Sequence, residues 1–249
     1  MIIAEGLTKK FGDLIAVNNL NLNIKKGEIY GFLGPNGAGK TTTIKLLTGI
    51  LTPDKGNIKI LGLNMNDNPV QIKRRIGVVF DEPKIYENLK GWEYINFIID
   101  IYRLKREETM KYLNDIISAF GIDYLNGFIG DYSYGMKQKL VVSSVLMRRP
   151  EVLFLDEPTV GLDARSSKIL KLLLEKQANE GVTIFFTTHI LEIAEKMCKR
   201  IGIINKGNLI AEGTLEELRR LSKQKESSLE DLFLELTGGE EIKEIVQEL

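Results

Sequence analysis

Apolar residues recur along the chain in short runs separated by polar segments, which is typical of a protein built on buried strands. Residues 19–24 alternate strictly between polar and apolar side chains, as expected of a strand with one buried face. Apolar residues at 201–204 and 209–211 flank Lys206 and Gly207, so a hairpin is predicted there. Further strands are predicted at 28–33, 58–61, 76–80, 152–155 and 182–186.

Helical spacing of the apolar residues replaces the strand pattern in the middle of the chain. Residues 92–104, 107–120 and 134–147 have this spacing, and few β-type runs interrupt them. Buried strands interleaved with helices favour a parallel α/β sheet. We therefore expect an α/β fold in which a helical subdomain, about residues 84–148, is inserted.

The sequence beyond Thr214 is charged and helical in pattern. Two amphipathic stretches, 229–236 and 242–249, are separated by Gly238 and Gly239. Such stretches are more often docking helices on their own domain than separate modules. We expect one domain over residues 1–215 and a C-terminal helical tail over 216–249.

The charge balance and the single cysteine narrow the classes of function. Lysine plus arginine equal aspartate plus glutamate at 34 each, and there is no basic run, so a nucleic-acid partner is not expected. Cys198 cannot form an intramolecular disulfide, which fits a reducing compartment. No apolar stretch approaches the ~18 residues of a membrane span, and the N-terminus lacks a signal-peptide pattern. We expect a cytoplasmic protein that meets a membrane only through a partner.

The segment 34–41 has the pattern G-x-x-x-x-G-K-T between a predicted strand and a predicted helix. In this pattern the glycines let the backbone come close to a chain of phosphates, and the helix N-terminus attracts the anion. Lys40 reaches the β- and γ-phosphates, and the Thr41 hydroxyl can ligate Mg²⁺. The residues of this phosphate loop are Gly34, Pro35, Asn36, Gly37, Ala38, Gly39, Lys40 and Thr41, followed by Thr42.

A second acidic motif follows the apolar strand at 152–155. Open α/β sheets bind ligands at the carboxyl ends of their strands, which is where Asp156 and Glu157 lie. Asp156 is suited to hold Mg²⁺, and Glu157 is suited to polarise the water that attacks a γ-phosphate.

The segment Tyr-Ser-Tyr-Gly-Met-Lys-Gln at 132–138, about twenty residues before 155–158, resembles the L-S-G-G-Q signature of ABC-transporter ATPase subunits. Residues 161–163 are similar to the D-loop of that family, and 187–189 to its switch-histidine segment. Phe11 matches the aromatic position that stacks on adenine. The resemblance covers roughly residues 2–215, and the tail at 228–238 is similar to tails of drug- or antibiotic-type exporter subunits.

The resemblance implies a phosphate-loop NTPase core: a RecA-like parallel sheet, an N-terminal antiparallel β-subdomain and a helical insertion. It implies an ATP-hydrolysing subunit, with ATP and Mg²⁺, that drives a separate membrane permease from the inner face of the cell membrane. Its ATPase partner is a second copy of the chain or, alternatively, a different subunit. Ser133 and Gly135 would contact the nucleotide of that opposite subunit, His189 would contact the γ-phosphate beside the base Glu157, and Mg²⁺ ligands would be Thr41, Asp81 and Asp156.

Two positions depart from the family pattern. Asp81 stands where the family usually has a glutamine that ligates Mg²⁺ and senses the permease. Tyr134 stands at the first glycine of the signature. Three alternatives stay open: a non-transport ABC ATPase shares every motif, an importer subunit is the rival within transport, and another phosphate-loop enzyme would make the signature a coincidence.

Overall fold

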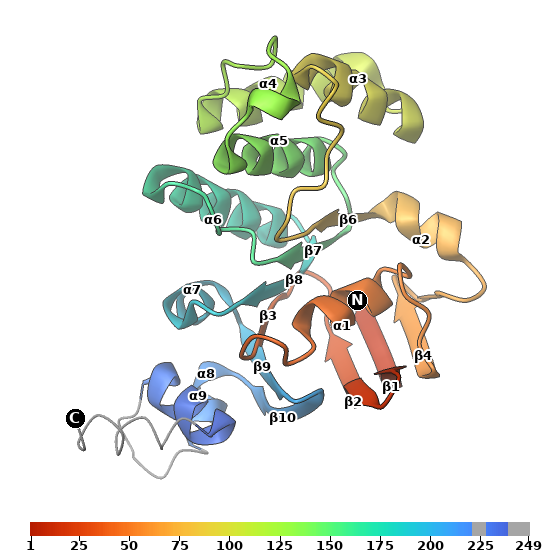
Figure 1. Cartoon of the computed structure of the whole chain (residues 1–249), viewed down its shortest axis with the longest axis vertical. Helices are drawn as coiled ribbons and strands as arrows, with labels where there is room; N and C mark the ends of the chain where they lie inside the picture. The colour runs from red at the N-terminus through yellow and green to blue at the C-terminus, as the bar shows by residue number, and fades with distance from the viewer. Residues whose placement is uncertain (221–227, 239–249) are drawn as a thin grey trace.

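A six-stranded sheet forms the centre of the computed structural model, which describes residues 1–220 and 228–238 (Figure 1). Its strand order is β10-β9-β3-β8-β7-β6, and all neighbours are parallel except the hairpin β9–β10. The strands are β3 (Ile29–Leu33), β6 (Ile76–Val79), β7 (Val152–Asp156), β8 (Thr183–Thr188), β9 (Arg200–Asn205) and β10 (Asn208–Gly213). The predicted parallel sheet and hairpin are confirmed.

A separate antiparallel sheet carries the N-terminus, as predicted. Its order is β2-β1-β4-β5, from β1 (Ile2–Phe11), β2 (Leu14–Ile24), β4 (Lys55–Ile60) and β5 (Leu63–Asn64). Helix α1 (Lys40–Leu47) lies between the two sheets, because its buried residues share one apolar cluster with residues of both.

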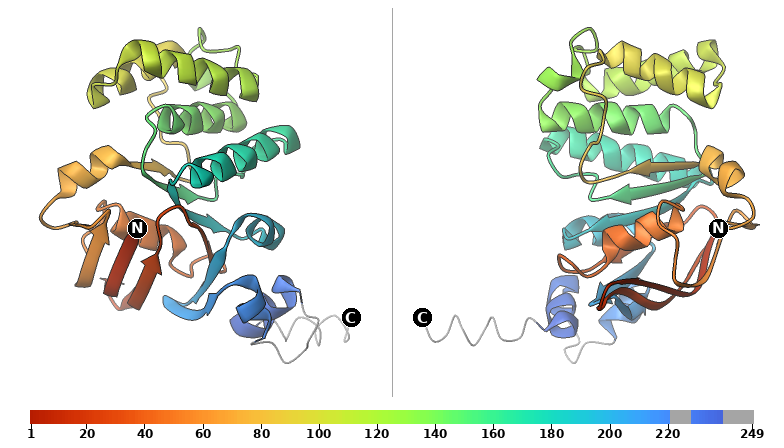
Figure 2. Two further views of the ribbon diagram at one scale, coloured as in Figure 1. Left: turned by 180° about the vertical axis from the view of Figure 1, so that it is seen from behind. Right: turned by 45° about the vertical axis from the view of Figure 1, so that its right-hand side comes forward.

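The helical insertion lies at one end of the molecule, and the antiparallel sheet and the last helices lie at the other (Figures 1 and 2). The insertion contains α3 (Gly91–Tyr102), α4 (Arg106–Phe120) and α5 (Tyr134–Leu146). Helix α6 (Ala164–Asn179) packs between it and the parallel sheet in a second apolar cluster. The predicted helices are correct to within about two residues at each end.

The C-terminal helices pack against the half of the parallel sheet that contains β3, β9 and β10. Helices α7 (Leu191–Met197), α8 (Leu215–Arg219) and α9 (Leu229–Thr237) enclose a third apolar cluster, which also contains Leu33 at the end of β3. The predicted docking of residues 229–236 on their own domain is thus observed, whereas the stretch 242–249 lies outside the described residues. The division at residue 215 stays a prediction.

Helices α6 and α7 were not predicted from the sequence, nor was the short helix α2 (Pro69–Arg75). Pro69 occupies its first turn, where a missing N–H costs nothing, and the helix is too short to show a periodic pattern. Within the described residues, no helix combines the length and apolar character needed to cross a lipid bilayer.

Phe185 occupies the middle of the core between the two sheets. Its ring centroid lies 5.2 Å from that of Phe32 and 5.9 Å from those of Tyr30 and Phe154, and all four side chains are fully buried. We expect Phe185→Ala to lower the free energy of unfolding by about 3–5 kcal/mol because a large cavity remains. Urea unfolding followed by circular dichroism checks this. The half-exposed Leu172 on α6 is the control, since its change to alanine should cost less than about 0.5 kcal/mol.

Candidate active site

The phosphate loop connects β3 to α1, and its first and last glycines are required by packing. A Cβ on Gly34 would lie 2.4 Å from the carbonyl oxygen of Ile204. A Cβ on Gly39 would lie 2.4 Å from the carbonyl oxygen of Ala16, and Gly39 has a φ of 109°. The loop is therefore held tightly between the hairpin and the antiparallel sheet, while Asn36 and Gly37 are exposed.

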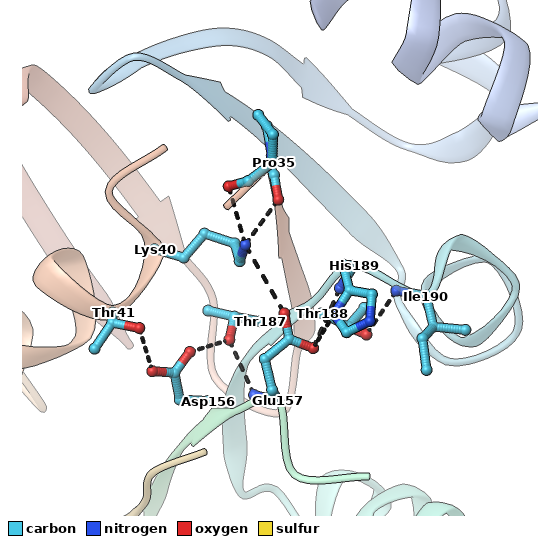
Figure 3. A network of polar contacts seen from close by, with 10 residues as sticks. Pro35, Lys40, Thr41, Asp156, Glu157, Thr187, Thr188, His189 and Ile190 are labelled. Carbon is cyan, nitrogen blue, oxygen red and sulfur yellow. Dashed lines mark hydrogen bonds and ion pairs between the residues drawn. The ribbon is translucent and has the colours of Figure 1, made fainter. Parts of the chain in front are cut away.

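Lys40, at the start of α1, is buried beneath this loop (Figure 3). Its Nζ donates to the carbonyl oxygens of Gly34, at 2.7 Å, and Pro35, at 3.2 Å. The same atom lies 3.8 Å from Oε1 of Glu157. Burial lowers the pKa of Lys40, while Glu157, Asp156 and Asp81 act in the opposite direction. The ammonium group of Lys40 is thus fixed beside the phosphate loop.

Asp156 ends β7 with a fully buried carboxylate. Thr41 donates its hydroxyl to Oδ2 at 2.6 Å, and Thr187 donates to Oδ1 at 2.5 Å (Figure 3). Burial raises the pKa of Asp156, and the two hydroxyl bonds oppose that rise. Each carboxylate oxygen therefore has a partner from a different element, α1 and β8.

Glu157 follows directly and has a left-handed backbone with a φ of 48°. Its N–H lies 3.2 Å from the carbonyl oxygen of Thr187 and 3.2 Å from the Thr187 hydroxyl. Its Oε2 lies 3.0 Å from Nδ1 of His189 and accepts the His189 backbone N–H at 3.2 Å. The nearly buried carboxylate thus points between Lys40 and the half-exposed His189 imidazole (Figure 3).

Lys40, Asp156 and Glu157 line one hollow of about 460 Å³. Phe11, at the end of β1 and 47% exposed, lines the same hollow with Leu14, Ile15 and Lys206. The other residues lining it are Ala16, Asn36, Gly37, Ala38, Gly39, Lys40, Thr41, Thr42, Asp81, Asp156 and Glu157. The hollow thus brings together the predicted nucleotide-contacting residues Phe11, Asn36 and those from Gly37 to Thr42. Gly34 and Pro35 do not line it, but their carbonyl oxygens accept hydrogen bonds from Lys40.

Ser133 and Gly135 do not line this hollow. They lie at the N-terminus of α5, where the exposed Ser133 hydroxyl accepts the N–H of Met136 at 3.3 Å and keeps its own hydrogen free to donate. Their separation from the phosphate loop of the same chain is what a site completed by a second subunit requires.

Oxygen donors converge where a metal was predicted. Thr41, Asp81 and Asp156 all line the hollow, and hydroxyl and carboxylate oxygens are the donors that Mg²⁺ prefers. No group of three or more His, Cys, Asp or Glu side chains forms a cation site in the part of the chain that the structure describes. The donor set fits Mg²⁺ held by few protein ligands together with phosphate oxygens.

Sequence reasoning did not identify the roles of Thr187 and Lys206. Thr187 belongs to the segment noted for His189, but only the pairing of β8 with β7 brings its hydroxyl to Asp156. Lys206 was predicted only as a turn residue. Its turn lies beside Phe11, because Gly207 donates its N–H to the carbonyl oxygen of Ala38 and accepts the N–H of Asn18.

The fold and the site define a phosphate-loop nucleotide-binding protein of the α/β class. The family model described as ABC transporter matches residues 17–160. The chain therefore belongs to the ABC transporter family, among its ATP-binding subunits, and the resemblance found in the sequence is confirmed. A model for an AAA domain also matches residues 126–195.

Curated relatives include proteins named for bacitracin transport and for a multidrug ABC transporter. The bacitracin transport ATP-binding protein BcrA of Bacillus licheniformis is 38% identical over 90% of this chain and 73% of its own length. The probable multidrug ABC transporter ATP-binding protein YbhF of Escherichia coli is 35% identical over 95% of this chain. This chain spans only 41% of the length of YbhF.

Solved structures agree. A structure described as the ATP binding subunit of an ABC transporter has a TM-score of 0.90 and 30% identity, covering 95% of this chain and 99% of its own. The ATP-binding cassette MJ0796, a dimer in a post-hydrolysis state bound to ADP and Pi, has a TM-score of 0.79 and 27% identity, covering 86% and 99%.

The Thr187 hydroxyl can be tested on the ligand-free protein. Thr187→Val keeps the shape but leaves Oδ1 of the buried Asp156 without that donor, so we expect the free energy of unfolding to fall by about 1–3 kcal/mol. In an Asp156→Asn background the same change should cost clearly less, because no buried charge remains. Equal costs in the two backgrounds, measured by urea unfolding, would contradict this assignment.

Proposed function

We propose that this chain is an ATP-hydrolysing subunit that powers a separate membrane permease, most simply an exporter. The observation that carries the proposal is the convergence of Lys40, Asp156 and Glu157 on one hollow that begins at a phosphate loop. The imidazole of His189 lies 3.0 Å from the Glu157 carboxylate. Relatives named for bacitracin transport and for daunorubicin/doxorubicin resistance support the direction of transport.

In this proposal the hollow holds ATP along its length. Phe11 stacks on the base at one end, which contributes about 1 kcal/mol and therefore tunes affinity. Backbone N–H groups of the loop and the N-terminus of α1 hold the phosphates, and Lys40 exchanges its contact with Glu157 for the β- and γ-phosphates.

Thr41, Asp156 and Asp81 would hold Mg²⁺ on the phosphate side of the hollow. Bound Mg²⁺ neutralises charge on the phosphate oxygens. Asp156 needs no side-chain movement for this role, because Thr41 already directs its hydroxyl to the same place.

Glu157 is the general base in this proposal. A water between its carboxylate and the γ-phosphate would be polarised for attack, while His189, 3.0 Å from Oε2, fixes the carboxylate and reaches the γ-phosphate. The left-handed backbone at Glu157 sets this direction before any nucleotide binds.

A second subunit would complete the site, with Ser133 and Gly135 donating to the γ-phosphate across the interface. ADP lacks that phosphate, so hydrolysis removes the contact. Shifting the ratio of closed to open dimers from 1:99 to 99:1 takes about 5.5 kcal/mol, or roughly 2.7 kcal/mol from each ATP. Charge-assisted hydrogen bonds to one phosphate are of that order.

The permease would dock at a hollow of about 210 Å³ between the parallel sheet and the helical insertion. Lys84, Tyr94 and Tyr102 line it, together with the loop residues Glu82 and Pro83 that follow Asp81. Of two further aromatic residues in the insertion, Tyr86 is 60% exposed and packs against Phe97, and Trp92 packs on the core of the insertion. The loop that carries Asp81 thus borders both hollows.

Glu157→Gln tests the base. The amide cannot take a proton, so we expect ATP binding to persist while turnover falls by about a hundredfold or more and a closed dimer accumulates. Phosphate release measures turnover, and light scattering in the presence of ATP measures the closed dimer. Glu151→Gln, at the exposed residue just before β7, is the matched control and should turn over normally. Near-normal turnover of Glu157→Gln would refute the base assignment.

Lys84→Glu tests the docking surface. Lys84 is highly exposed and lines the proposed docking hollow, so reversing its charge should weaken capture of the permease by about tenfold and leave intrinsic ATPase activity unchanged. Lys105→Glu is the control, since Lys105 is equally exposed on the start of α4. Equal loss of capture in both variants would place the docking surface elsewhere.

A further inference from the structure

The two residues that depart from the family pattern contact each other. The hydroxyl of Tyr134, the first residue of α5, donates to the backbone carbonyl oxygen of Asp81. Asp81 belongs to the loop that leaves β6 for the helical insertion. A glycine at position 134 could not span this distance, so the contact exists only because of the departure.

The ring of Tyr134 also covers the loop that follows Glu157. A Cβ on Gly161 would lie 2.2 Å from Cδ1 of Tyr134, and Gly161 has a φ of +73°. The neighbouring Gly135 approaches the same loop, because a Cβ there would lie 2.6 Å from the carbonyl oxygen of Gly161. The start of α5 is therefore in close contact with the loop 158–163.

Two further bonds fasten α5 to this loop. The buried Gln138 donates its Nε2 to the carbonyl oxygen of Pro158 at 3.4 Å. Lys139 lies 3.2 Å from Oδ2 of Asp163. These two contacts join α5 to the loop after Glu157, whereas the Tyr134 hydroxyl reaches the loop of Asp81. Lys137 of α5 pairs with Glu87 further along that same loop.

The Asp81 loop belongs to the nucleotide hollow of its own chain. Asp81 lines that hollow, and its carboxylate accepts the N–H of Glu82 at 2.8 Å. Its charge acts on Lys40 and on Asp156, raising the pKa of each. Tyr134 thus connects a residue of the chain's own site to Ser133 and Gly135, which do not line the hollow of that site.

We infer that Tyr134 is a positioning residue that ties the Ser133–Gly135 segment to the Asp81 loop, so that each subunit presents this segment to its partner's ATP in a fixed position. The inference rests on the proposed function, because it assigns Ser133 and Gly135 to the opposite nucleotide. Fixing the segment in advance lowers the entropy lost when the dimer closes, which strengthens ATP-driven association.

Hydrogen exchange on the nucleotide-free chain tests the link itself. Tyr134→Phe removes the hydroxyl and keeps the ring, so exchange at the backbone amides of 82–86 should rise by about fivefold while 159–163 stays protected. Tyr134→Gly removes the hydroxyl and the ring, so exchange should rise at 82–86 and at 159–163. Tyr124→Phe is the matched control, because its hydroxyl donates to the carbonyl oxygen of Met136 within the insertion.

Association tests the consequence. In the Glu157→Gln background, Tyr134→Phe should weaken the ATP-dependent dimer by about 5-fold per subunit, up to about 25-fold in the dimerisation constant, while ADP affinity of the monomer stays within about twofold. Analytical ultracentrifugation and titration calorimetry measure these. Tyr124→Phe should leave the dimer unchanged.

The outcomes separate the two hypotheses. Unchanged exchange at 82–86 in Tyr134→Phe overturns the inference, and so does an unchanged dimerisation constant. A rise in exchange throughout the chain would also overturn it, because Tyr134 would then only stabilise the fold. If the Glu157→Gln chain alone forms no dimer with ATP, the shared site fails and the inference fails with it, even where the exchange result shows the Tyr134–Asp81 link intact.

Discussion

A buried negative charge at the end of β7 is the constraint on which the rest of the site depends. The carboxylate of Asp156 has no exposed surface, and such a group is stable only when its oxygens are bonded. Its two partners come from the start of α1 and the end of β8. Satisfying this one group therefore fixes the phosphate loop, the base-bearing strand end and the histidine segment relative to one another.

The same arrangement holds Glu157 in a conformation that residues with a side chain seldom adopt. A left-handed backbone at such a residue costs of the order of 1–3 kcal/mol and persists only where neighbours enforce it. Thr187 supplies that enforcement through its carbonyl oxygen and its hydroxyl. Thr187 thus holds the left-handed backbone of Glu157 in place and also donates a hydrogen bond to the buried carboxylate of Asp156.

Much of this could be predicted from the sequence, because the phosphate loop and the Asp156–Glu157 pair are local patterns placed by the strands beside them. The buried strands and the helices α3, α4 and α5 were likewise predicted from periodicity, whereas the longest helix, α6, was not. The roles of Thr187 and Lys206 could not be predicted, since strand pairing across the fold brings these residues to the site. The contact of Tyr134 with Asp81 was also beyond reach: each departure was visible alone, but 53 positions separate them and only the fold joins them.

The last helix has a consequence for how the molecule is held together. Leu229 and Leu232 of α9 are fully buried in a cluster that includes Leu33, the residue immediately before the phosphate loop. The N–H of Leu229 bonds Glu195 on α7, which begins two residues after His189. Helix α9 therefore completes the packing behind the phosphate loop and the His189 segment. During synthesis this packing forms only after every catalytic residue has been made.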